Sequence, residues 1–374
     1  MIFSGTFKKI TNIKAKNLEA APPPVMDFTL LGIGRNNKTQ LGITPTETNI
    51  AFVEVTPSFK WIDISTGRNH GILLNVSGEV WGLGETAFNQ LGTQINTSAT
   101  PIPLRVGVES DFKFITANYE INFGIKSDGT IWGIGNPAGS MLGVGASGGN
   151  WTQLSGDTDW VSCANGQFHV VALKSNGTMW GRGVNTYNQL DYTPTNTSGI
   201  SIWRQMGSSF NWKAIESGTN NTYGVTVSGD VYAVGQNHLN QSGANPTSNK
   251  TTFTLTSNSS NTNKIAAKDN TAWILKNDGT IWALGSNNGG ASGGSGNKAV
   301  FTQVGNDNDW VNIRPGLLCL YAQKIDGTWW GMGFNLYGEQ GVSAPTSFSS
   351  FVQVTFNDEI KFIDGGYAWA WALK

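Results

Sequence analysis

Charged residues are scarce in this sequence. Asp, Glu, Lys and Arg make up 13% of its 374 residues, and the formal net charge is −1, whereas ordinary proteins carry about 25% charged residues. A general nucleic-acid binder shows an excess of basic residues, so no nucleic-acid partner is expected. The chain has no run of about 18 apolar residues, so no membrane-spanning helix is predicted.

Cysteine and histidine are also few. Cys163 and Cys319 lie far apart in the sequence, and only three His are present. These numbers are too small for a disulfide framework or a structural zinc site. We expect two buried free thiols and no metal ligands, cofactor-binding residues or catalytic residues. The basic N-terminal segment is not followed by an apolar run of about 7 to 15 residues, so an ordinary secretory signal peptide is not expected.

Glycine and tryptophan, in contrast, are abundant, with 48 and 15 residues. Many of them belong to a recurring phrase, for example WGLGETAFNQLG at 81–92 and WGRGVNTYNQLD at 180–191. Seven copies follow one another at spacings of 48 to 52 residues, and their leading positions are Leu31, Trp81, Trp132, Trp180, Tyr232, Trp282 and Trp330. A fixed period of this length predicts a repeat architecture.

Each repeat reads as four short strands. In the second copy these are 59–65, 70–76, 80–84 and 101–106. Turns such as Ser-Asp-Gly-Thr and Val-Ser-Gly-Glu separate the second and third strands, because Gly tolerates the positive φ of tight hairpins. No segment shows sustained helical periodicity, so almost no helix is expected. Four antiparallel strands in about 50 residues predict a propeller blade.

The two ends of the chain complete one blade between them. Residues 361–374 supply only the first two strands of a repeat, while 27–34 and 51–55 supply the third and fourth. Pairing these segments closes the ring and removes its exposed edges. The predicted fold is therefore all-β: a seven-bladed β-propeller of four-stranded antiparallel blades over residues 26–374, closed by the N- and C-terminal strands.

The repeat resembles that of the regulator of chromosome condensation family. The shared features are a Gly-x-x-His before the second strand (Gly67 with His70, Gly166 with His169), the Trp-Gly phrase, a following Asn, and Gln-Leu-Gly. The resemblance covers residues 26–374 and implies a seven-bladed propeller. Family members include exchange factors for a small GTPase that bind chromatin, and similar propellers include a secreted β-lactamase inhibitor and repeat arrays on bacterial or phage surfaces. The resemblance thus implies a fold more than an activity.

Other short motifs are interpreted as structural. A GxGxxG at Gly143, Gly145 and Gly148 lacks the following helix that a dinucleotide site needs. Two paired acids, Asp157 with Asp159 and Asp307 with Asp309, fall in turns before a Trp, where we expect them to cap the following strand. His70 and His169 share a repeat column with Ile121 and Trp369, which favours a packing position over a ligand site.

The strand order predicts which face binds a partner. In a four-stranded meander, the first-to-second and third-to-fourth connections lie on one face, and variable loops on a rigid scaffold usually carry function. The Gly of the Gly-x-x-His feature (Gly67, Gly166) stands at a fixed position of the repeat, which we call the Gly column, and the residues that follow this column form an inner ring on this face. Farther out, a second repeat position in the loops, the outer column, contains aromatic residues that either bind a partner or pack their own loops. The candidate partner residues are Arg68, Tyr119, Gln167, Asp269 and Tyr367 in the inner ring, and Phe88, Tyr187 and Tyr337 in the outer column.

Residues 1–25 match no repeat. They combine a strand-like segment with the stiff Ala-Ala-Pro-Pro-Pro spacer, which favours docking onto other virion or surface proteins by strand addition; a tail without fixed structure is the alternative. Together with the low charge and the Asn-, Gly- and Thr-rich loops, this favours a non-enzymatic propeller on a virion or extracellular surface. It would act as a phage tail- or capsid-associated structural or adhesion protein that binds a host receptor protein or glycan. The alternatives are a soluble secreted inhibitor or regulator and, against the near-neutral charge, a chromatin-linked GTPase exchange factor.

Overall fold

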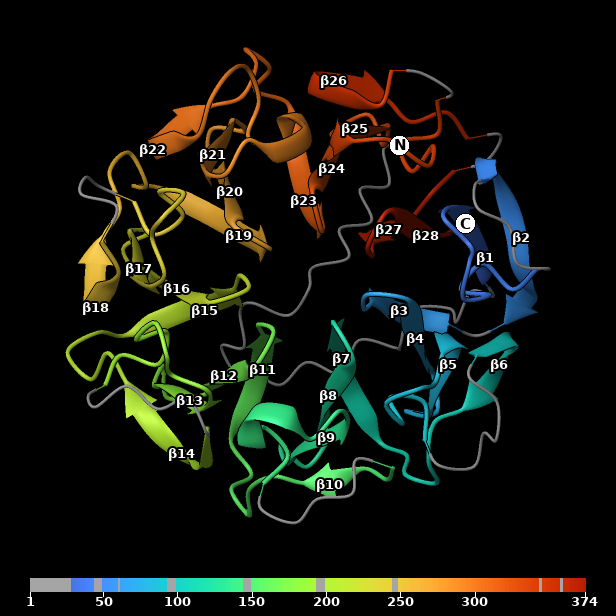
Figure 1. Ribbon diagram of the computed structural model, residues 1–374, viewed down its shortest axis with the longest axis horizontal. Helices are drawn as coiled ribbons and strands as arrows, with labels where there is room; N and C mark the ends of the chain where they lie inside the picture. Colours follow the sequence, from blue (N-terminus) through green and yellow to red (C-terminus); the bar gives the residue numbers. More distant parts are fainter. Residues whose placement is uncertain are drawn as a thin grey trace, which may run out of the picture.

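Seven four-stranded antiparallel sheets surround a common axis in the computed structural model (Figure 1). The structure describes residues 28–43, 49–59, 61–92, 99–143, 149–192, 199–243, 248–342, 345–356 and 359–374. The arm at residues 1–25 therefore lies outside the described residues, and so do Gly145 and Gly148 of the GxGxxG. Within the described ranges, the only helices are two three-residue 3-10 turns, η1 (Ala138–Ser140) and η2 (Asn288–Gly290).

The strands of blades 1 to 4 follow the predicted order. Blade 1 contains β2 (Asn49–Phe59), β1 (Phe28–Gly34), β28 (Trp369–Leu373) and β27 (Phe362–Gly365). Blade 2 contains β3 (Trp61–Thr66), β4 (His70–Asn75), β5 (Val80–Glu85) and β6 (Ala99–Arg105). Blade 3 contains β7 (Phe112–Asn118), β8 (Ile121–Lys126), β9 (Ile131–Gly135) and β10 (Thr152–Gln153). Blade 4 contains β11 (Trp160–Asn165), β12 (His169–Lys174), β13 (Met179–Gly183) and β14 (Ile200–Met206).

Blades 5 to 7 repeat the pattern. Blade 5 contains β15 (Trp212–Ser217), β16 (Asn221–Thr226), β17 (Val231–Gly235) and β18 (Lys250–Leu255). Blade 6 contains β19 (Thr262–Lys268), β20 (Thr271–Lys276), β21 (Ile281–Gly285) and β22 (Lys298–Gln303). Blade 7 contains β23 (Trp310–Gly316), β24 (Cys319–Lys324), β25 (Trp329–Phe334) and β26 (Ser347–Gln353). The first strand of each blade lies nearest the axis (Figure 1).

Blade 1 closes the ring as predicted. The N-terminal strand β1 pairs with the C-terminal strand β28 over five residue pairs, from Leu30 opposite Leu373 to Gly34 opposite Trp369. The blue and red strands share this blade in Figure 1. Because the fourth strand β2 also comes from the N-terminal side, the closure joins two strands from each end of the described chain.

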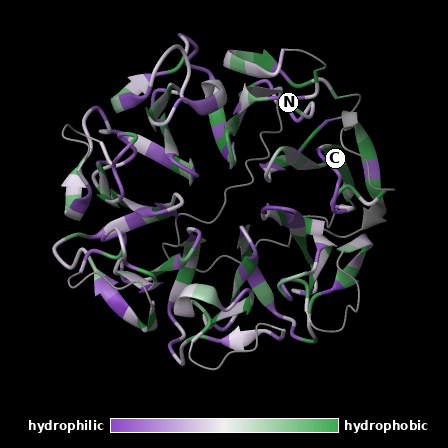
Figure 2. Ribbon diagram, viewed as in Figure 1, coloured by the Kyte–Doolittle hydropathy of each residue, from purple (hydrophilic) through white to green (hydrophobic). Residues whose placement is uncertain are grey.

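The core lies between adjacent blades rather than within any one of them. Every residue of β4 is buried, and successive side chains face opposite neighbours. Leu73 shares a hydrophobic cluster with Trp371 of blade 1, and Ile72 shares one with Ile115 of blade 3. Hydrophobic and hydrophilic residues are accordingly interleaved in every blade (Figure 2).

A hydrogen-bonded turn explains why the repeat keeps an acid or amide, Gly, Thr and Trp. Asp128 Oδ1 accepts bonds from Thr130 N (2.9 Å) and Oγ1 (2.7 Å), and Trp132 Nε1 donates to Thr130 Oγ1 (2.8 Å). Lys126 Nζ lies 4.2 Å from the centre of the Trp132 ring. The same unit recurs at 174–180, 276–282 and 324–330. Each unit fixes the second-to-third hairpin of its blade.

The paired acids have a structural role, but they do not act by capping the following strand. Asp157 and Asp159 both bind the ammonium of Lys174, at 2.8 and 3.0 Å, and Lys174 belongs to the second strand of the same blade. Asp307 and Asp309 bind Lys324 in the same way, at 2.8 and 3.2 Å. The lysine that lies over the Trp ring is thus also the partner of the acidic turn, a contact that spacing along the chain does not predict.

Candidate binding face at the propeller axis

The first-to-second turns of the blades meet around the axis and bind one another through their backbones. Arg68 N donates to Tyr119 O (2.9 Å), Gln167 N to Thr219 O (3.1 Å) and Thr219 N to Asp269 O (2.8 Å). Tyr367 N donates to Arg68 O (3.3 Å), which continues the ring across the closing blade. The inner-ring column predicted from the sequence therefore lies around the axis, and backbone bonds join most of its neighbouring turns, although not those of blades 3 and 4 or of blades 6 and 7.

A second set of backbone bonds shows which loops share this face. The residue after the third strand donates to the first-to-second turn of its own blade, as in Asn136 N to Glu120 O (2.9 Å) and Val184 N to Phe168 O (2.7 Å). In contrast, the second-to-third turn binds the start of the next blade, as in Phe112 N to Gly78 O (3.0 Å). The first-to-second and third-to-fourth connections therefore lie on one face, and we call this the loop face.

The Gly column exists because a side chain occupies the space above each glycine. A Cβ on Gly67 would lie 2.2 Å from His70 Cε1, and one on Gly166 would lie 2.2 Å from His169 Cε1. Both histidines are fully buried, as expected for packing positions. Burial lowers the pKa of His70 to about 4 and that of His169 to about 3, because the charged imidazolium loses its hydration.

Two blades break the Gly column, and both exceptions reach the axis. Asn118 stands at this position in blade 3 and Lys268 stands there in blade 6. The residues that follow them, Tyr119 and Asp269, have φ values of +45° and +51°, an uncommon conformation for residues other than Gly. Neither Asn118 nor Lys268 was predicted as a site residue, although each replaces a repeated Gly in the sequence.

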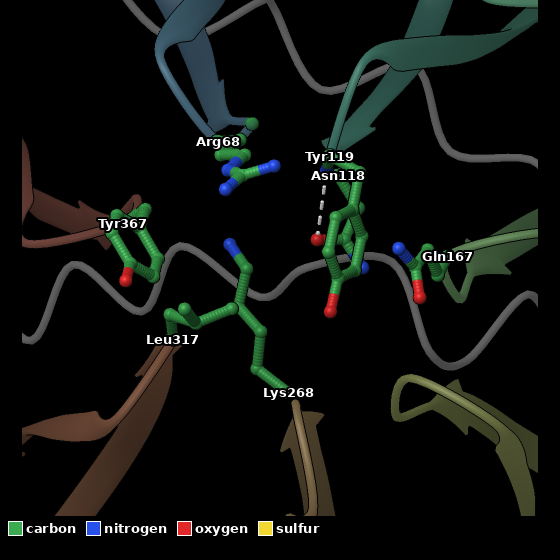
Figure 3. Close-up of a pocket in the computed structure, with 8 residues that line it drawn as sticks. Arg68, Asn118, Tyr119, Gln167, Lys268, Leu317 and Tyr367 are labelled. Carbon is green, nitrogen blue, oxygen red and sulfur yellow. Dashed lines mark hydrogen bonds between the residues drawn. The ribbon is translucent and has the colours of Figure 1, made fainter.

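A shallow cavity of about 180 Å³ opens on the loop face at the axis. Figure 3 shows Arg68, Tyr367 and Lys268 close together on one side of it, with Tyr119 and Gln167 on the other. Four of the eight predicted partner residues line this cavity, and the lining consists of Gly67, Arg68, Asn118, Tyr119, Gln167, Lys268, Leu317 and Tyr367. We call it the axial pocket.

Lys268 extends across the axis from blade 6. Its ammonium donates to Gly365 O (2.8 Å) in blade 1 and to Thr66 O (3.0 Å) in blade 2. The residue is 6% exposed, and burial lowers the pKa of the ammonium. Within the described part of the chain, no carboxylate oxygen lies close enough to form an ion pair with it. The lysine therefore joins three blades through backbone carbonyls.

Tyr119 crosses the axis in the other direction. Its backbone N–H binds Asn118 Oδ1 (3.1 Å; Figure 3), and its hydroxyl lies 2.9 Å from Thr219 Oγ1 in blade 5. Thr219 Oγ1 in turn donates to Asp269 Oδ1 (3.0 Å). Burial raises the pKa of Tyr119 to about 12. Asp269 thus supports Tyr119 through this chain of bonds and does not itself line the axial pocket.

The rim of the axial pocket carries exposed polar groups. Arg68 lies 5.6 Å above the centre of the Tyr367 ring, and its side chain is 48% exposed. Its contact with Glu120 is long, at 3.8 Å, so the pair leaves guanidinium donors available. Gln167 is half-buried at the opposite side.

The outer-column residues do not line the axial pocket. The backbone N–H groups of Phe88, Tyr187 and Tyr337 bind the side chain two residues later, at 2.8 to 2.9 Å. Phe88 is 40% exposed, whereas Tyr187 and Tyr337 are half-buried. Arg35 lies 5.3 Å from the centre of the Tyr337 ring. These hydrogen bonds fix the backbone of the third-to-fourth loops, while a role of the aromatic rings in binding a partner stays a prediction.

The remaining chemical features are few. Cys163 and Cys319 are buried free thiols, which confirms the prediction. Across the ranges given above, no group of three or more His, Cys, Asp or Glu is arranged to hold a metal ion. No helix in those ranges is both long and apolar enough to cross a membrane.

Comparison of the sequence with known proteins gives partial matches. A regulator of chromosome condensation from Xenopus laevis is 27% identical over 157 residues, which cover 38% of this chain and 36% of that protein. The Homo sapiens protein of the same name is 24% identical over 128 residues, covering 33% and 30%. The matches thus span only about a third of the length of these curated relatives. No protein-family model matches the chain.

Similar solved structures cover almost the whole propeller. Human WBSCR16 superposes with a TM-score of 0.82 at 16% identity, over 92% of this chain and 98% of that one. Prp20p from Saccharomyces cerevisiae, with described binding to Gsp1p and histones, superposes with a TM-score of 0.82 at 17% identity, over 93% and 92%. At these identities the likeness concerns the fold. The chain is therefore a seven-bladed β-propeller with the fold of the regulator of chromosome condensation proteins, to which part of its sequence is similar.

Proposed function

We propose that this chain is a protein-binding propeller, without catalytic activity of its own, that contacts its partner through the loop face. The axial pocket carries this proposal, because it gathers an exposed arginine, two tyrosines and an amide around one axis. Aromatic and Arg side chains are enriched where proteins contact one another. Prp20p, which shares the fold, has described binding to Gsp1p and histones and has been observed bound to Kap60.

We place this binding function on a virion or extracellular surface. The low charge and the Asn-, Gly- and Thr-rich loops of the sequence support that location, and residues 1–25 would dock the propeller onto neighbouring surface proteins. A soluble regulator that binds one protein is the second candidate, and it rests on the partial similarity to regulators of chromosome condensation.

Site-specific photo-crosslinking of the full chain tests the binding face. Gln167 on the loop face and Ile325 in a second-to-third turn would each be replaced by p-benzoylphenylalanine. Ile325 is 76% exposed and lies on the opposite face, so it is a matched control. Illumination in an extract of the source should cross-link a partner from position 167 only. Equal cross-linking from position 325, or none from 167, would contradict the proposal.

Location and binding are tested separately. Immunogold labelling of intact particles and cells from the source should detect the chain on a surface. A chain found only as a free soluble species would support the regulator instead.

A further inference from the structure

We propose that the axial pocket binds a carboxylate, and that this carboxylate is an acidic side chain of the protein partner. The inference rests on the proposed function, because it names the chemistry of the partner at the same face. It depends on three features of the pocket: the charges of its lining, its unused hydrogen-bond donors and its size.

The lining contains two cationic side chains, Arg68 and Lys268, and no carboxylate. The acids around the pocket lie outside its lining, and they include Asp364 and Glu216, whose charges both act on the Lys268 ammonium. Glu120 accepts a bond from Asn136 Nδ2 (3.1 Å) besides its long contact with Arg68, and Asp269 accepts one from Thr219. Asp364 accepts bonds from Thr66 N and Oγ1, both at 2.8 Å. These acids reduce the cost of burying the cations without filling the pocket.

The donors of the lining outnumber its acceptors. An ammonium has three N–H donors, and Lys268 uses two of them on Thr66 O and Gly365 O. Among the described residues, the side-chain amide of Gln167 forms no hydrogen bond, and the Arg68 guanidinium, which lies over the Tyr367 ring, has only its long contact with Glu120 as an ion pair. A ligand that fits this set must therefore bring acceptors, and charged acceptors form the stronger bonds with Lys and Arg.

The size of the pocket restricts the ligand to a small group. A volume of about 180 Å³ suits one side chain and not a folded element. Tyr119 and Tyr367 flank the pocket (Figure 3) and would contact the aliphatic part of a Glu or Asp side chain. The backbone bonds of Arg68 with Tyr119 and of Tyr367 with Arg68 hold these residues in place before binding, which lowers the entropic cost of association.

Ligand-observed ¹⁹F NMR of trifluoroacetate with the full chain tests the pocket chemistry. We expect weak binding, with a Kd on the order of millimolar, and no binding of trifluoroethylammonium. Arg68→Gln and Lys268→Gln should each weaken trifluoroacetate binding by about tenfold. Arg105→Gln is the matched control, because Arg105 is also a partly exposed arginine paired with a glutamate, Glu79, at 3.2 Å, and it does not line the pocket; it should leave binding unchanged.

Two peptides test whether the pocket accepts the carboxylate of a side chain as well as that of a small free acid. Acetyl-Gly-Glu-Gly-amide should displace trifluoroacetate, whereas the Gln counterpart should not. Displacement by both peptides, equal binding of trifluoroethylammonium, or an equal loss in Arg105→Gln would overturn the inference. Circular dichroism checks whether Lys268→Gln is folded. If this variant does not fold, Arg68→Gln still tests the pocket, because it changes an exposed side chain.

The outcome separates this inference from the proposed function. Cross-linking from position 167 without trifluoroacetate binding would leave a protein-binding face that does not select carboxylates. Trifluoroacetate binding without any cross-link would confirm the pocket chemistry and contradict the proposed protein partner.

Discussion

The buried histidines predict a loss of stability in mild acid. His70 and His169 have pKa values lowered to about 4 and about 3 in the folded protein, whereas an unperturbed His titrates near pH 6.5. The folded state keeps both imidazoles neutral while the unfolded chain takes up protons. Their contribution to stability is therefore fully present above pH 6.5 and is lost as the pH falls toward these folded values.

The magnitude follows from the width of that window. Between pH 6.5 and pH 5, each histidine lowers the free energy of unfolding by about 1.4 kcal/mol per pH unit, which amounts to about 2 kcal/mol over the interval. The two together remove about 4 kcal/mol, a large part of the typical stability of a domain. Buried Glu339 has a raised pKa and changes stability in the opposite direction, so the comparison must be made between variants.

The variant H70N/H169N is the appropriate comparison. Blade 5 already has Asn221 at the same repeat position, so Asn is compatible with the column. Urea unfolding at about pH 7.5 and about pH 5 gives the change in unfolding free energy for each protein. The wild type should lose about 4 kcal/mol more than the double variant. His238→Asn, at an exposed histidine, is the control and should behave as the wild type. Equal losses in wild type and H70N/H169N would refute the reasoning.

Three further changes test the packing and the ends of the ring. Gly71→Ala would place a Cβ 2.2 Å from Trp371 Cζ3 and should lower the unfolding free energy by about 1–3 kcal/mol in urea; an unchanged midpoint would contradict the close packing of blades 1 and 2. Cys163 and Cys319 are both buried, and burial raises the pKa of Cys319 to about 12. Iodoacetamide should therefore modify neither thiol of the native protein at neutral pH and both in denaturant, as counted by mass spectrometry. Deletion of residues 1–25 should leave the melting temperature unchanged, because β1 begins at Phe28, and should release the protein from its surface assembly; retention of the shortened chain there would argue against docking by the arm.

The sequence predicts the ring well because its signals are local and repeated. A hairpin such as 126–132 contains its own lysine, acid, threonine and tryptophan, so its structure follows from nearby residues. Seven copies of the longer repeat at one period define the blade number, and the incomplete repeats at the two ends define the closure.

The axial pocket could be predicted only in part. The inner ring was found because it follows the Gly column, and Arg68, Tyr119, Gln167 and Tyr367 do line the pocket. The contacts that cross the axis were missed, such as Lys268 with Thr66, 202 residues apart. Such contacts depend on the relative placement of non-neighbouring blades and on side-chain rotamers, and neither has a periodic signature. Only the replacement of Gly by Lys and Asn marked the two blades concerned.

The closing blade also determines how the propeller responds to mechanical load. Thr29 and Lys374 exchange two backbone hydrogen bonds, of 3.0 and 3.1 Å, at one end of the β1–β28 pair. Because the strands are antiparallel, the N-terminal end of β1 and the C-terminal end of β28 lie at the same edge of the sheet. A force that pulls these two strand ends apart breaks the hydrogen bonds of the pair one after another, starting at Thr29 and Lys374, and does not load all of them at once.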